Sequence, residues 1–294
     1  MKSFLSLLLL LALFTMPLQA QQWSPERPGQ SATTSTVPAG QLSLEAGFRW
    51  EHASFSPVIP ESFVDPGMIY AHDIFVLPAG MARLGLGQHF ELRLSSSYRR
   101  WKWEYDPNYL DGNGVDDPVV RKTDAGLEFL TVSIKSALLE ERGALPAMAM
   151  VAVLGLPRTG SGGFQVQYLA PDFALAFSHT LSPAVSLTYN FGTRWDGYIV
   201  TPIGYYTAAV TALLHPRLAA FFEFYGDLPG HAPPVHAVDA GLSWRVGDDL
   251  HLDGAFAYGL NSPGKEDSDP DISNMIATDV AVEIGASWRV TLWE

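Results

Sequence analysis

The chain of 294 residues contains no cysteine, which excludes disulfide bonds, thiolate nucleophiles and zinc sites built on cysteine. The chain has no long apolar run after its N-terminal segment. No later stretch reaches the roughly 18 consecutive apolar residues of a membrane-spanning helix. Basic residues are scarce too, with 18 Lys and Arg against 31 Asp and Glu and a formal charge of −13. Such acidity argues against a nucleic-acid partner.

The first twenty residues have the organisation of a secretory signal peptide. Lys2 supplies a positive charge, an uninterrupted apolar run extends from Leu5 to Phe14, and Ala20 precedes a polar stretch. We therefore expect residues 1–20 to be cleaved off during export. A single transmembrane anchor is the less favoured alternative, because the run is shorter than the roughly 20 residues that a spanning helix needs.

Twelve stretches alternate apolar and polar residues with a period of two, which is the side-chain period of a β-strand. In the last stretch, apolar side chains from Val280 to Leu292 share one face, whereas Glu283 and Arg289 lie on the other. Such long alternation is typical of tilted membrane strands of about 9–11 residues. The predicted strands are Gln41–His52, Asp73–Leu86, Phe90–Glu104, Thr123–Leu139, Leu145–Leu156, Asp172–Leu181, Val185–Asp196, Ile203–Leu214, Leu218–Asp227, Val235–Val246, Leu250–Asn261 and Ala277–Trp293.

The connectors between these strands alternate between short and long. Tight turns rich in Gly, Pro and Asp, such as Gly87–His89 and His215–Arg217, alternate with longer segments such as Ala53–His72. Twelve up-and-down strands need this alternation when both chain ends are periplasmic. We therefore predict an all-β protein, a 12-stranded antiparallel up-and-down transmembrane β-barrel over residues 41–294. A soluble sandwich or lipocalin-like barrel is the alternative, and it would direct its apolar face inward.

The strand faces turned away from lipid carry six acidic and six basic residues. They are Glu45, Arg49, Arg83, Glu91, Arg93, Lys135, Glu223, Asp239, Arg245, Asp253, Glu283 and Arg289. Such a balanced set can pair across the lumen and narrow it, because buried charges need partners. Two interpretations stay open: a polar constriction that selects solutes, and a structural salt-bridge network that fills the interior.

Residues 21–40 precede the first strand and contain three prolines and a Ser/Thr run, so they cannot form a membrane strand. One interpretation is a plug inside the barrel, in which Trp23 and Arg27 meet luminal groups. The other is a disordered periplasmic tail.

The segments Arg27–Ser31 and Thr36–Phe48 resemble the opening of the MetA-pathway of phenol degradation family, a group of transporter-like outer-membrane barrels. Further stretches carry the same resemblance, namely Ala82–Leu86, Phe90–Leu94, Tyr189–Gly192, Tyr206-Thr207, Phe222–Gly226, Asp239–Trp244 and Leu252-Asp253. The resemblance covers essentially the whole chain after the signal peptide. It implies passage of small aromatic or hydrophobic compounds.

Barrels of this kind usually end on an aromatic residue that the barrel-assembly machinery reads, so we expect this machinery as a partner. Here Trp293 is penultimate and Glu294 follows. Because Trp293 also falls on the face assigned to the lumen, we expect a bulge or a register shift near the end of the last strand.

Two acidic segments, Asp106–Asp117 and Glu266–Asp271, are rich in the oxygen ligands that calcium prefers. Their spacing lacks the glutamate that closes a calcium loop, so we interpret both as solvated loops and expect no metal or cofactor. Ser178 and His179 are adjacent and therefore lie on opposite faces of their strand, where they cannot cooperate in catalysis. We expect no enzymatic activity.

The favoured function is an outer-membrane channel or transporter for small hydrophobic or aromatic compounds. Its partners would be outer-membrane lipid and a small-molecule solute, and its location would be the bacterial outer membrane. The alternative is a structural or adhesive surface barrel with a closed lumen.

Overall fold

The computed structural model describes residues 24–53, 68–106, 119–198, 200–230, 234–261 and 278–293. The expected signal peptide, Trp23 and the acidic segments beyond Asp106 therefore lie outside the described residues. Within these ranges the chain forms thirteen strands and one short 3-10 turn, η1 (Gly162–Phe164). No helix in the described ranges is long and apolar enough to cross a membrane.

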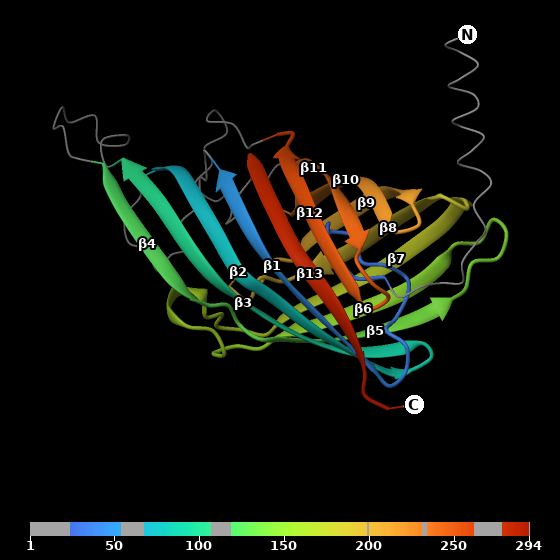
Figure 1. The fold of residues 1–294 in the computed structure, drawn as a ribbon. Coiled ribbons are helices and arrows are strands. Elements are labelled where there is room, and N and C mark those ends of the chain that lie inside the picture. The colour runs from blue at the N-terminus through green and yellow to red at the C-terminus, as the bar shows by residue number, and fades with distance from the viewer. Residues whose placement is uncertain are drawn as a thin grey trace, which may run out of the picture.

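All strands belong to one antiparallel sheet that closes on itself (Figure 1). β1 pairs with β2 on one side and with β13 on the other, and the pairing of β2 with β3 continues the ring. This confirms the predicted all-β antiparallel barrel. The strands are β1 (Gln41–Ala53), β2 (Met68–Gly87), β3 (Phe90–Asp106), β4 (Val120–Leu127), β5 (Thr131–Leu139), β6 (Ala147–Gly155), β7 (Ala170–Ser182), β8 (Val185–Arg194), β9 (Ile203–His215), β10 (Leu218–Pro229), β11 (Val235–Arg245), β12 (Leu250–Gly259) and β13 (Val280–Thr291).

The two ends of the barrel carry connections of different length. The short turns between β2 and β3 and between β9 and β10 belong to the end at which the chain leaves β13. At this end the amide of Leu292 donates to the carbonyl of Gly40 at 2.8 Å, and the amide of Gly40 donates to the carbonyl of Gly85 at 3.0 Å. Short turns mark the periplasmic end of an outer-membrane barrel, so we call the opposite end extracellular.

The predicted strand Thr123–Leu139 is interrupted in the structure, so the prediction of one continuous strand is wrong. β4 pairs with the extracellular part of β3, and β5 pairs with its periplasmic part. β4 and β5 together therefore occupy one position of a twelve-position barrel, with residues 128–130 outside the ladder between them. In Figure 1, β4 follows β3, whereas β5 lies beside β6.

Side chains alternate between the two faces of the wall as the sequence pattern predicts. On the outer face, the large apolar side chains of Leu92, Phe173 and Ile284 are 38, 50 and 57% exposed. On the inner face, Arg83 and Lys135 are fully buried. This arrangement is the reverse of a soluble barrel, and it presents a continuous apolar band to lipid.

The end of the last strand differs from the expectation. The register of β13 with β1 runs without a shift to Thr291, where the strand ends. Trp293 follows the strand, lies half exposed, and its amide donates to the carbonyl of Gly40 at 3.3 Å. The expected bulge or register shift is therefore absent from this pairing. Because β13 ends at Thr291, Trp293 does not belong to either face of the strand.

Candidate functional site

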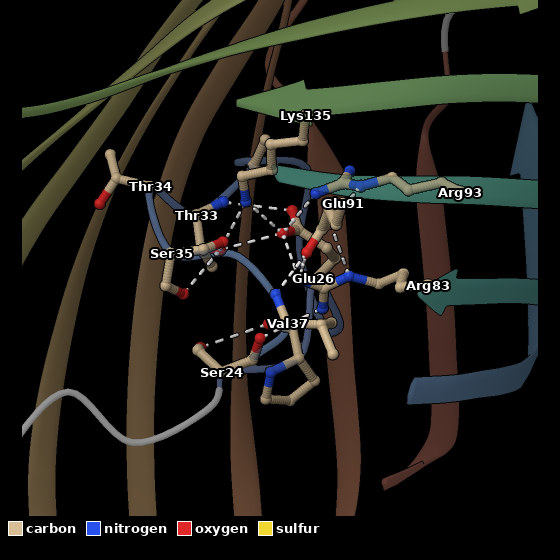
Figure 2. Close-up of polar contacts among 12 residues, drawn as sticks. Ser24, Glu26, Thr33, Thr34, Ser35, Val37, Arg83, Glu91, Arg93 and Lys135 are labelled. Carbon is tan, nitrogen blue, oxygen red and sulfur yellow. Dashed lines mark hydrogen bonds and ion pairs between the residues drawn. The ribbon is translucent and has the colours of Figure 1, made fainter. Parts of the chain in front are cut away.

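Residues 24–40 lie inside the barrel, and we call them the luminal segment. Its backbone and side chains bond to strands around the wall: the amide of Ala32 donates to Oδ1 of Asn190 on β8 at 2.6 Å. The hydroxyls of Thr34 and of Ser178 on β7 are 2.7 Å apart. The amide of Val37 donates to the carboxylate of Glu91 on β3 at 2.6 Å (Figure 2). The luminal segment thus crosses the interior before β1 begins.

Glu26 is the central charged residue of the luminal segment. Its carboxylate lies 2.7 Å from Nζ of Lys135, 2.9 Å from Arg93 and 3.3 Å from Arg83 (Figure 2). The hydroxyl of Thr33 donates to the same carboxylate at 2.9 Å. Burial alone would raise the pKa of Glu26, but the positive charges of Arg93, Lys135 and Arg83 outweigh it and hold this pKa well below its usual range. Glu26 is therefore ionised at neutral pH.

The three cations around Glu26 form a basic cluster (Arg83, Arg93 and Lys135) on β2, β3 and β5. Two wall carboxylates complete it: Glu45 lies 2.7 Å from Arg83, and Glu91 lies 3.1 Å from Arg83 and 2.5 Å from Arg93. Three cations thus face two carboxylates of the wall, and Glu26 supplies the third negative charge. Full pairing of this kind is what makes buried charges tolerable.

A second arc of the wall, β10 to β13, carries an acidic cluster (Glu223, Asp239, Asp253 and Glu283). Arg27 of the luminal segment lies 2.6 Å from Glu283 and 3.4 Å from Asp253. Glu223 accepts hydrogen bonds from the amide of Gln30, at 2.6 Å, and from the hydroxyl of Ser31. Two consecutive residues, Glu26 and Arg27, therefore match the opposite charges of two arcs of the wall.

Arg27 rests on two glycines that the sequence analysis did not single out. Gly47 and Gly285 are register partners on β1 and β13 and face the lumen. A Cβ atom on Gly47 would lie 2.3 Å from Nη2 of Arg27, and one on Gly285 would lie 2.5 Å from its Nε. Glycine at both positions leaves room for the guanidinium. Gly in a strand interior often marks such a close approach. These two glycines are therefore the sequence signal from which the position of Arg27 could have been predicted.

The remaining predicted luminal charges lie at two levels. Arg49 pairs with Glu283 at 3.2 Å on the neighbouring strand. Arg245 and Arg289 lie near the periplasmic turns, where Arg245 donates to the carbonyl of Pro216 at 3.0 Å and Arg289 lies 2.8 Å from Asp249. Among the described residues, the ion pairs of the wall charges join nearby strands, adjacent turns or the luminal segment. The lumen is narrowed by residues 24–40.

Two cavities flank the luminal segment. The extracellular one has a volume of about 430 Å³ and is lined by Met81, Val151 and Tyr205 together with charged groups of the wall. The periplasmic one measures about 270 Å³ and is lined in part by Leu213 and Phe221. Residues 26, 27 and 31 line both cavities, so the luminal segment is the partition between them.

Ser178 and His179, which were considered for catalysis, point to opposite faces of the barrel wall. The Ser178 hydroxyl faces the lumen and bonds to Thr34, whereas the ring of His179 stacks at 6.0 Å on Tyr189, which belongs to the predicted outward face. In the described part of the chain, no group of three or more His, Asp or Glu side chains is arranged to hold a metal ion.

A closed barrel with apolar side chains outside and buried ion pairs inside is an outer-membrane β-barrel protein. The family model described as "Putative MetA-pathway of phenol degradation" matches residues 26–266, so the chain belongs to this family. A search of curated proteins gives no match.

A solved structure agrees with the fold. The chain is similar to an outer membrane channel from Pseudomonas putida F1, with a TM-score of 0.59, 9% identity, and coverage of 90% of this chain and 100% of that one. It is also similar to the NanC porin, with a TM-score of 0.49, 9% identity, and coverage of 85% and 100%. For the translocator domain of the autotransporter NalP from Neisseria meningitidis the values are 0.49, 9%, 85% and 88%.

Proposed function

We propose that this protein is an outer-membrane channel for small apolar or aromatic solutes, and that the luminal segment restricts its straight path to the periplasm at rest. The observation that carries the proposal is the pair of cavities separated by an ion-paired segment of the chain itself. A purely structural interior would be close-packed, with few voids larger than a water molecule.

The size of the cavities and the apolar part of their lining favour small organic solutes, and the extracellular cavity is also lined by six charged residues. Volumes of about 270 and 430 Å³ are near the lower end of the range for ligand pockets, which are mostly apolar with a few polar groups. Met81, Val151 and Tyr205 offer apolar and aromatic contacts on the extracellular side. The family's description, which refers to phenol degradation, supports the same class of solute.

The alternative is a structural or adhesive barrel whose lumen stays closed. It is favoured by one observation, the dense ion pairing of Glu26 with the fully buried side chains of Arg83 and Lys135. Under this alternative the luminal segment would be a permanent part of the core, and no solute would cross.

Uptake by intact cells separates the two functions. N-phenylnaphthylamine is an apolar aromatic amine that fluoresces in membranes and is excluded by an intact lipopolysaccharide layer. Cells that express the wild-type protein should take it up faster than cells with an empty vector. Equal rates, with the folded barrel present in the outer membrane, would reject the channel and favour the structural function.

A further inference from the structure

Positive charge on the lipid-facing side of the described strands is confined to one place. Leu92 faces outward on β3, and Arg100 and Lys102 follow it at even spacing and share its face. On β4, which lies beside β3 in Figure 1, Arg121 shares a face with the exposed Leu127. The outward faces of the other described strands carry no Lys or Arg, although the chain contains 18 such residues. We call Arg100, Lys102 and Arg121 the outer basic patch.

The outer basic patch lies at the extracellular boundary of the apolar band. Arg100 is ten residues from Phe90, which begins β3 at the periplasmic end. At about 3.3 Å per residue and a tilt of about 40°, this is roughly 25 Å along the barrel axis, which equals the height of the apolar band. Register pairing places Phe75 of β2 and Trp50 of β1 at the same level. Aromatic side chains mark the interfaces of such barrels, so both observations place the patch among the lipid headgroups.

The wall does not neutralise the two cations on β3. Among the described residues no carboxylate lies within 4 Å of Arg100 or Lys102, and both side chains are exposed. Nζ of Lys102 lies 5.1 Å from the centre of the Phe75 ring, a contact that holds the ammonium group at the outer surface. Arg99, on the inward face of the same strand, instead lies 2.7 Å from Glu128.

The two carboxylates of the same outer region bond to other groups. Asp73 bonds to the His52 ring at 3.0 Å and accepts from the Trp50 indole at 3.2 Å. Glu104 lies 2.6 Å from Arg121. Two of the three cations in the outer basic patch are therefore available to a ligand.

The lipid headgroups at this level carry phosphate. The outer leaflet of a bacterial outer membrane consists of lipopolysaccharide, whose lipid A part bears phosphates on a disaccharide above its acyl chains. A guanidinium group binds phosphate through two parallel hydrogen bonds, and an ammonium group binds it as a point charge. Clusters of Lys and Arg beside a membrane-spanning segment attract anionic headgroups for this reason. Just below the patch, Tyr98 and Leu127 are exposed register partners that an acyl chain would cover.

We propose that Arg100 and Lys102 bind a phosphate of lipid A, with one of its acyl chains packed on Tyr98 and Leu127. The proposal does not depend on the proposed channel function. The alternative is general anchoring, in which long cationic side chains reach any headgroup at the interface. Anchoring can use cations anywhere around the barrel, whereas one bound lipid needs them at adjacent positions, as they are here.

Native mass spectrometry of the folded protein in detergent micelles tests the site, with bisphosphorylated lipid A as the titrated ligand and EDTA to remove bridging cations. Each Lys or Arg near an anionic membrane surface contributes about a factor of five in affinity, so Arg100→Gln/Lys102→Gln should weaken binding roughly 30-fold. A matched control, Arg142→Gln/Arg217→Gln, removes the same charge from exposed periplasmic turns and should bind as wild type does. Arg100→Lys/Lys102→Arg keeps both charges and should retain most of the affinity.

Two results would overturn the proposal. Equal affinities of wild type, the Gln variant and the control for lipid A would leave only general anchoring. Equal affinities of wild type for lipid A and phosphatidylglycerol, both lowered by the Gln substitutions, would assign the patch to phosphorylated headgroups of any kind. Faster migration of each unheated variant on SDS gels identifies a folded barrel, so a loss of binding then reports on the site and not on misfolding.

Discussion

Replacing Glu26 with glutamine should unseat the luminal segment. Glu26 is the sole carboxylate within 4 Å of Lys135 among the described residues, at 2.7 Å, and Lys135 would keep only the Thr33 hydroxyl at 3.0 Å. Arg83 and Arg93 would each keep Glu91. The substitution thus leaves a fully buried ammonium group without a carboxylate within 4 Å.

The size of the effect follows from this geometry. Removing one partner of a buried ion pair costs about 3–5 kcal/mol. At about 1.4 kcal/mol per factor of ten, the equilibrium between the seated and released segment should shift by roughly 100-fold or more toward release. The cost falls on this equilibrium rather than on barrel unfolding, because the segment can leave while every strand pair stays intact.

Planar-bilayer recording measures the shift. Glu26→Gln should raise the mean current toward that of a variant lacking residues 21–36, whereas Glu140→Gln, in an exposed turn, should behave as wild type. Adding Lys135→Gln to Glu26→Gln should restore part of the closure, since the unpaired ammonium is then gone. If the Glu26→Gln current equals that of wild type while the deletion variant gives a high current, Glu26 does not hold the luminal segment in place.

Three further predictions concern the wall. Leu92→Arg, on the lipid face, should lower the free energy of unfolding by about 2–4 kcal/mol in urea titrations if it lies near the midplane. Ser95→Arg, on the luminal face, should lower it much less, and equal costs of the two substitutions would contradict the face assignment. Unheated protein should run faster than boiled protein on SDS gels, and identical mobility of folded samples would count against a closed barrel. With residues 21–36 deleted, neutral replacements of Arg49, Arg93 and Lys135 should shift the reversal potential toward cation preference, and an unchanged potential would remove these residues from the conduction path.

The barrel was predictable because apolar and polar side chains alternate over the whole length of a strand in a membrane wall. The alternation in Phe90–Leu94 and in Val280–Leu292 gave both the strands and their lipid faces. The interruption at residues 128–130 was not predicted, although Phe129 and Leu130 are consecutive apolar residues that break the alternation. A break in period two is equally consistent with a bulge, so the pattern does not say whether a strand ends.

The luminal segment was less accessible to sequence reasoning. A plug at residues 21–40 was one of two interpretations, because a segment without regular structure has no period to indicate what it contacts. Arg27 was named as a luminal contact, but its neighbour Glu26 was missed. The pairing of Glu26 with Lys135 spans 109 residues, and only the closure of the ring brings these two side chains together.

Diffraction from crystals soaked in 4-iodophenol tests the central claim most directly, because iodine gives an anomalous signal that locates the ligand without ambiguity. The proposed function predicts an iodine peak inside the barrel, in the extracellular cavity beside Met81, Val151 and Tyr205. Iodine peaks confined to the lipid-facing surface, with none in either cavity, would contradict a channel for small aromatic solutes.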